Sequence, residues 1–207
     1  MKRALAAIAF ALACSGSAYA QDTSMSFFVT SANPGKGGDL GGLQGADAYC
    51  DTLAKAAGST GKSWKAYLST DAENAKDRIG TGPWYKDKGA KIADDVASLH
   101  SDSNNLTKQT ALNEKGEVIN GRGDTPNRHD ILTGSKADGT AATETCGNWT
   151  MGGADGAAIV GHSDRTGLND SAEAKSWNSS HATRGGCTVE AFKGTGGEGL
   201  FYCFAVK

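Results

Sequence analysis

The chain has 207 residues and a formal net charge of −2, with 21 basic and 23 acidic side chains. This balance argues against a nucleic-acid-binding protein, because phosphate backbones bind basic surfaces. The length suits one domain of ordinary size, and 29 glycines with a mean hydropathy of −0.42 indicate extensive loops around the core.

The first 20 residues have the pattern of a secretory signal peptide. Lys2 and Arg3 precede an apolar run over 4–13, and an A-x-A cleavage signal ends at Ala20. The apolar run is too short to cross a bilayer, and no later segment resembles a membrane helix, so we expect no membrane span. Removal of residues 1–20 changes the net charge to −4.

Lipidation at Cys14 is the alternative to simple cleavage. Such signals usually carry a larger aliphatic residue where this chain has Ala11. We therefore expect cleavage after Ala20 and a single mature domain over 21–207. The protein is expected to be exported, to the periplasm, the cell surface or the extracellular space.

The mature chain keeps four cysteines: Cys50, Cys146, Cys187 and Cys203. An even number in an exported chain predicts two disulfides, and four cysteines allow three connectivities. Free thiols or a metal site are the alternative, but the chain has no C-x-x-C pair and its four histidines are scattered.

The N-terminal third predicts a strand, a helix and a second strand. The strand over 27–30 ends at the turn-forming residues 33–38. Alternating apolar residues over 64–69 predict a half-buried strand. Between them, apolar residues recur at helical spacing, with Gly58 as the C-cap: Leu43, Ala46, Cys50, Leu53, Ala54 and Ala57. Cys50 therefore faces the core.

The rest of the chain alternates short apolar pieces with long polar loops. A brief helix is predicted over 92–99 in the polar middle region. Short strands are predicted at these ranges: 117–119, 131–132, 149–151 and 157–160. Residues 201–206 are continuously apolar or aromatic, which indicates a buried central strand. These elements predict an α+β fold.

Four motifs follow one another in a fixed order. They are "GGLQGADAYC" over 41–50, "KAYLST" over 65–70, "TGS" over 133–135 leading to the Cys-x-x-Trp of 146–149, and "FYCFA" over 201–205. This order resembles the endostatin branch of the C-type lectin fold, including the endostatin domain of collagen XVIII and the leptospiral endostatin-like surface proteins. The resemblance implies one domain with a long loop region. It also implies that Cys50 pairs with Cys203 and that Cys146 pairs with Cys187.

Sugar-binding C-type lectins hold calcium with carboxylates in two loop motifs, because this hard cation needs several oxygen ligands. The corresponding segments here are 125–127 (Thr-Pro-Asn) and 177–179 (Trp-Asn-Ser), and both lack the carboxylate. Asp124 could replace one of the missing groups. We expect no cofactor, with calcium as the alternative.

Zinc and catalysis have little support in the sequence. His129, His162 and His181, with Asp164, stand isolated in polar loops, and the mature N-terminus lacks the histidines that bind zinc in some endostatins. We therefore expect no metal site. No Gly-x-Ser-x-Gly, no His-Glu-x-x-His and no unpaired cysteine supplies a catalytic group, so we expect a protein that is not an enzyme.

Two segments contain candidate ligand-binding residues. In "KSWNSSHATRGG", Trp177 is expected at the surface, where it could stack on a sugar, with Asn178 and His181 beside it. Trp149 is expected in the core.

In "GRGDTPNRHD", Arg122 and Asp124 flank Gly123 in the tripeptide that integrins read. Glycine, aspartate and proline are also the residues that a tight turn needs. A structural turn is the preferred interpretation, ahead of an integrin ligand.

These features predict an exported, lectin-like binding protein of bacterial type, without catalysis. Its partner is expected to be a glycan or a protein of an extracellular matrix or host surface, as in cell adhesion, bound through the loops over 116–186. The alternative is a structural component of the periplasm or matrix with no dedicated ligand.

Overall fold

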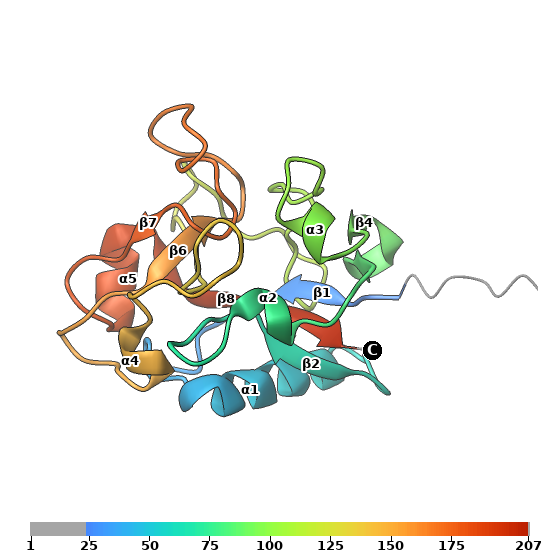
Figure 1. Ribbon diagram of the computed structural model, residues 1–207, viewed down its shortest axis with the longest axis horizontal. Helices are drawn as coiled ribbons and strands as arrows, with labels where there is room; N and C mark the ends of the chain where they lie inside the picture. Colours follow the sequence, from blue (N-terminus) through green and yellow to red (C-terminus); the bar gives the residue numbers. More distant parts are fainter. Residues whose placement is uncertain (1–23, 207) are drawn as a thin grey trace, which may run out of the picture.

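A long C-terminal strand, β8 (Gly197–Val206), runs through the centre of the molecule (Figure 1). The computed structural model describes residues 24–206, so the predicted signal peptide and Cys14 lie outside the described residues. No helix described between residues 24 and 206 combines the length and the apolar character that crossing a bilayer requires.

β8 is hydrogen-bonded along both of its edges. β1 (Phe27–Val29) pairs antiparallel with one edge, and the other edge is shared by β2 (Ser63–Ala66), which is antiparallel, and β5 (Asp130–Leu132), which is parallel. β6 (Ile159–His162) and β7 (His181–Ala182) continue the sheet beyond β5, each antiparallel to its neighbour. The C-terminal strand thus joins segments from the whole length of the chain.

Successive residues of β8 point into two different cores, as the period of a strand requires. Phe201, Cys203 and Ala205 pack in the core under the first helix. Tyr202 and Phe204 pack on the opposite face of the sheet. Burial on both faces explains why residues 201–206 read as a continuous apolar run, and the predicted central strand is confirmed.

The first helix, α1 (Gly42–Ala56), covers one face of the sheet (Figure 1). Its buried residues follow the predicted helical spacing: Ala46, Cys50 and Ala54. Gly58 ends the helix with φ 83°, its N–H donates to Lys55 O and the Ser59 N–H donates to Ala54 O. This is the Schellman arrangement that favours glycine, so the predicted helix end is confirmed.

Both disulfides have the pairing that the resemblance implies. Cys50 on α1 is bonded to Cys203 on β8, with a Cα–Cα distance of 5.7 Å. Cys146 is bonded to Cys187, with a Cα–Cα distance of 5.9 Å. The first bond fastens the helix to the central strand across a sequence separation of 153 residues.

The segment between β2 and β5 carries the small elements α2 (Ala75–Arg78), β3 (Trp84–Tyr85), η1 (Asp87–Gly89), β4 (Lys91–Ala93) and α3 (Val96–Leu99). The predicted helix over 92–99 is therefore wrong in its first half. Residues 91–93 pair with β3, and the helix begins only after Asp95, whose side chain accepts a hydrogen bond from the Ser98 N–H.

Three predicted short strands also need correction. Val118 forms only an isolated bridge with Leu112, so no strand covers 117–119. The strand predicted over 157–160 begins at Ile159 and continues to His162. The strand predicted over 149–151 is absent; α4 (Cys146–Trp149) stands there instead.

α4 is a left-handed turn, in which residues 146–149 all have positive φ angles: 47°, 61°, 55° and 65°. Such angles are strained for residues other than glycine. The turn is held by the Cys146 disulfide and by Trp149, whose Nε1 donates to Ser69 O at 2.8 Å. Trp149 is buried, as predicted, but from a turn and not from a strand.

Protonation of His100 is expected to lower the stability of the fold in mild acid. Val96 O accepts a hydrogen bond from its Nδ1 at 2.8 Å, so Nε2 is the acceptor for the Tyr67 hydroxyl at 2.7 Å. Burial lowers the pKa of His100 below its ordinary value. A lowered pKa means that the unfolded chain binds the proton first, so this contribution to stability is present above pH of about 6.5 and is lost as the pH falls. Urea unfolding at pH 7.5 and 5.5 should show a smaller loss in His100→Gln than in the wild-type chain; an equal loss would contradict this role.

Candidate functional site

Three neighbouring strands bring a histidine cluster together at one end of the sheet. Asp130 begins β5 and lies opposite His162, the last residue of β6. His181 begins β7 and lies opposite Val160 of β6. His129 directly precedes Asp130, so both residues reach the same end of the sheet as His162.

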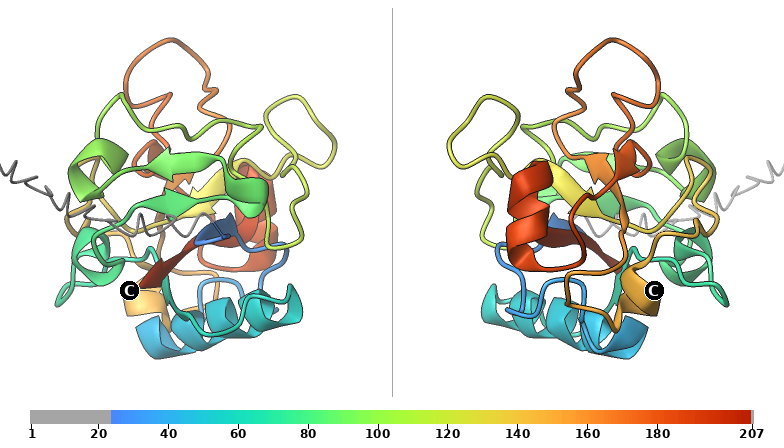
Figure 2. Two further views of the ribbon diagram at one scale, coloured as in Figure 1. Left: turned by 90° about the vertical axis from the view of Figure 1, so that its right-hand side faces the viewer. Right: turned by 90° about the vertical axis from the view of Figure 1, so that its left-hand side faces the viewer.

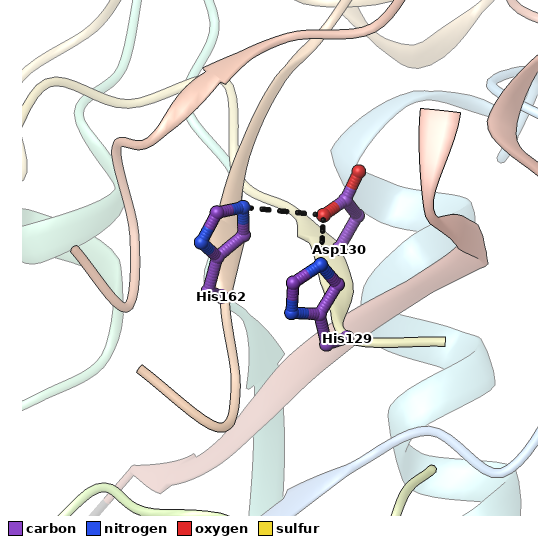
Figure 3. A group of neighbouring side chains, drawn as sticks. All are labelled: His129, Asp130 and His162. Carbon is purple, nitrogen blue, oxygen red and sulfur yellow. Dashed lines mark ion pairs between the residues drawn. The ribbon is translucent and has the colours of Figure 1, made fainter. Parts of the chain in front are cut away.

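The imidazoles surround one carboxylate oxygen. Oδ1 of Asp130 lies 3.2 Å from Nε2 of His129, 3.4 Å from Nε2 of His162 and 3.7 Å from Nε2 of His181. Figure 3 shows one nitrogen of the His129 ring and one of the His162 ring facing the same oxygen of this carboxylate. Asp130 is only 2% exposed, and neither of its carboxylate oxygens accepts a hydrogen bond from a described residue.

The Nδ1 atom of each ring contacts an oxygen that can only accept a hydrogen bond. Nδ1 of His129 donates to Asp164 Oδ1 at 3.0 Å, and Nδ1 of His162 donates to Ala174 O at 2.7 Å. Nδ1 of His181 donates to Ala182 O at 3.1 Å. Each neutral ring therefore carries its proton on Nδ1, and its Nε2 presents a bare lone pair.

The cluster changes the pKa values of its members. Burial lowers the pKa of His162, but contact with the Asp130 carboxylate and the Ala174 carbonyl outweighs this, so its pKa is raised. Burial raises the pKa of Asp164, but the hydrogen bonds from His129 and from the Arg122 N–H outweigh it, so its pKa is lowered. His129 and His162 stack almost in parallel, with ring centroids 4.3 Å apart.

A cavity of about 460 Å³ opens beside the cluster. All three histidines line it, together with two arginines and a leucine: Arg122, Arg184 and Leu168. The loop over 163–178, orange at the top of Figures 1 and 2, stands on the side of the molecule opposite α1. We call this side the loop face. A larger hollow of about 720 Å³ along residues 141–148 contains no histidine or cysteine.

Trp177 does not lie at the surface, so that prediction is wrong. Its side chain is 3% exposed and packs against Tyr67 and Tyr202, whose hydroxyl donates to Trp177 O at 2.9 Å. Gly161 allows this approach, because a Cβ there would lie 1.9 Å from Trp177 O. Asn178 is also buried, and its Nδ2 donates to the Tyr67 hydroxyl and to the Lys136 carbonyl.

The Arg-Gly-Asp segment forms the turn that was predicted. The Asp124 N–H donates to Gly121 O, and the Gly121 N–H donates to Asp124 Oδ2 at 2.7 Å. Asp124 also forms an ion pair with Lys108, while Arg122 is exposed. Asp124 and Asn178 therefore have separate hydrogen-bond partners.

His181 is the one predicted ligand-binding residue of the segment over 175–186 that lines the cavity with its neighbours in the cluster. The expectation that the histidines stand isolated is wrong for three of the four. Within residues 24–206, His129, Asp130 and His162 form a group whose ligand atoms lie within 4.8 Å of one another, so they could hold a metal ion.

A signal for this cluster was present in the sequence. His129 and Asp130 lie at the start of one predicted strand, and His162 follows the end of another. If two such strands are antiparallel neighbours, the start of one meets the end of the other. His181 had no such signal, because its two-residue strand is too short to predict.

Neither a protein-family model nor a curated protein matches the chain. The resemblance to endostatin-like proteins therefore stays a prediction.

Proposed function

We propose that the chain is an exported binding protein without catalytic activity, which recognises a glycan or a protein of an extracellular matrix or host surface through the cavity of the loop face. An endostatin-like C-type lectin fold is part of this proposal. The α+β architecture and the two disulfide pairings are consistent with it.

The observation that carries the proposal is the composition of the cavity rim. Arg122 and Arg184 line the cavity, and neither guanidinium forms an ion pair within residues 24–206. Leu168 is 85% exposed beside them. Two unpaired cations favour a ligand with carboxylate or sulfate groups, such as an acidic glycan, and an exposed leucine adds apolar contact area.

The test is binding to a glycan array and to a panel of matrix proteins. The double variant Arg122→Ala/Arg184→Ala should weaken binding at least about 10-fold, because each charge-assisted hydrogen bond contributes about 1.5–3 kcal/mol. The matched control Lys55→Ala/Lys115→Ala removes two exposed charges outside the cavity and should bind as the wild type does. Equal weakening in both variants would contradict a role for the cavity. If the wild-type chain binds nothing in either panel, the alternative is favoured, in which the protein is a structural component with no dedicated ligand.

A cell-attachment assay with the Asp124→Glu variant distinguishes binding through the cavity from binding through the Arg-Gly-Asp turn. We expect unchanged attachment, because the Asp124 carboxylate is bound to the Gly121 N–H and to Lys108. Integrin-dependent attachment that disappears in this variant, with the cavity variants still active, would show that the tripeptide is the ligand.

A further inference from the structure

The buried Asp130 carboxylate has no hydrogen-bond donor among the described residues as long as the neighbouring histidine rings are neutral. It is 2% exposed, and neither oxygen accepts a hydrogen bond from a described residue. Buried charges in proteins are normally paired, hydrogen-bonded or bound to a metal. Gly196 and Gly197 pack closely on Asp130: a Cβ on Gly196 would lie 3.1 Å from Oδ2 of Asp130, and a Cβ on Gly197 would lie 2.5 Å from its backbone oxygen.

The three histidines aim lone pairs, not protons, at this carboxylate. Their Nδ1 atoms donate outward, so Nε2 of each neutral ring is an acceptor. Nε2 of His162 lies 3.1 Å from Nε2 of His181. Acceptors at these separations repel one another unless a proton or a metal ion lies between them.

The separations of these atoms match the ligand shell of a small divalent ion. Tetrahedral zinc has bonds of about 2.0–2.1 Å to nitrogen and oxygen, which place neighbouring ligand atoms about 3.3–3.4 Å apart. Four of the separations within the cluster are 3.1, 3.2, 3.4 and 3.7 Å, and the ligand atoms of His129, Asp130 and His162 all lie within 4.8 Å of one another.

The surroundings of the rings are those of metal-bound histidines. Ligand histidines usually donate their other N–H to a carboxylate or a backbone carbonyl, which fixes the tautomer and the direction of the ring. Asp164 does this for His129, and the Ala174 carbonyl does it for His162. Both supporting contacts are partly buried.

We propose that His129, Asp130 and His162, with His181, bind one divalent transition-metal ion of the zinc class at the floor of the loop-face cavity. Imidazole and carboxylate together suit zinc and its neighbours, whereas calcium and magnesium take shells of oxygen. His181 is 40% exposed and lines the cavity, so an ion can reach the site from solvent. Metal binding is measured without any glycan or protein ligand, so a failure of this inference can be distinguished from a failure of the proposed ligand-binding function.

Calorimetric titration of the chelator-treated chain with Zn²⁺ tests the site. We expect one ion per chain, with no binding of Ca²⁺. Asp130→Asn and His162→Gln should weaken zinc binding more than about 100-fold. Asp164→Asn, which removes the support of His129, should weaken it about 10- to 100-fold. The matched control His100→Gln changes the one histidine outside the cluster and should keep the affinity.

Two measurements keep the test decisive if the buried variants fail to fold. His181→Ala alters a half-exposed side chain and should still lower the zinc affinity about 10- to 100-fold. Cobalt bound to the wild-type chain should show the strong visible absorption of a four-coordinate ion. The proposal is overturned if the wild-type chain binds no zinc at micromolar concentration, or if His181→Ala and Asp164→Asn bind it as the wild type does.

Discussion

Replacing Cys50 and Cys203 together by alanine should lower the free energy of unfolding by about 5 kcal/mol. The bond closes a loop with a sequence separation of 153 residues, and its removal restores the corresponding freedom to the unfolded chain. Both cysteines are fully buried between α1 and β8, so lost packing adds to the effect. Urea unfolding, followed by circular dichroism, measures the change.

The Cys146–Cys187 bond, which lies within the loop closed by the Cys50–Cys203 bond, supplies the control. Cys146 and Cys187 are 41 residues apart, so the same reasoning gives a loss of about 4 kcal/mol for their double alanine variant. The outer pair should therefore be the more harmful to lose. A smaller loss for Cys50 and Cys203 than for Cys146 and Cys187 would contradict the role of the outer bond as the main closure of the fold.

Asp47→Ala should lower the free energy of unfolding by about 3 kcal/mol, because it leaves a buried arginine paired only with the half-exposed Glu73, which contacts its Nη1 at 2.8 Å. Arg78 is 5% exposed, and its Nη2 donates to both carboxylate oxygens of Asp47, at 2.7 and 2.9 Å. Asp47 also accepts the Ala66 N–H at 2.9 Å, so it fastens α1 to both α2 and β2. The loss can be measured by urea unfolding.

Two further variants separate the buried pair from the exposed one. Lys65 also contacts Asp47 but is 41% exposed, so Lys65→Ala should cost less than about 1 kcal/mol. Adding Arg78→Met to Asp47→Ala removes the buried charge that only Glu73 still compensates, and should restore part of the lost stability. Asp47→Ala that costs no more than Lys65→Ala would show that the Arg78 pair contributes little.

Asp47 also lies in the first of the four sequence motifs. The Gly-Ala-Asp of the first motif corresponds to residues 45–47, and two of these have a structural purpose. A Cβ on Gly45 would lie 2.0 Å from Leu40 O, at the start of α1. Asp47 holds Arg78. Both positions concern the scaffold, so this motif carries information about the fold and none about the ligand.

The central strand and the first helix could be predicted because their patterns are local. Residues 201–206 are apolar on both faces, which only a strand covered on both sides requires. The spacing of Ala46, Cys50 and Ala54, and the glycine at 58, mark α1 and its end within a few residues. The presence of two disulfides could be predicted from the even number of cysteines and the expected export of the chain, although their pairing depended on the resemblance.

The candidate site could not be predicted in the same way, because it depends on strand pairing. His129 and His181 are 52 positions apart, and only the order β5, β6, β7 brings their ends together. Trp177 stands among serines and asparagine, a composition typical of a surface loop. It is buried because the backbone at Gly161 leaves room for it, which composition does not reveal.

X-ray diffraction at the zinc absorption edge, from crystals of the chain grown with zinc, tests most directly whether the loop-face cavity is built on a metal centre. We expect one strong anomalous peak per chain, between Nε2 of His129, Nε2 of His162 and Oδ1 of Asp130. The peak should be lost or much weaker in His162→Gln. A peak only at surface residues, or none in the cluster, would contradict the metal centre.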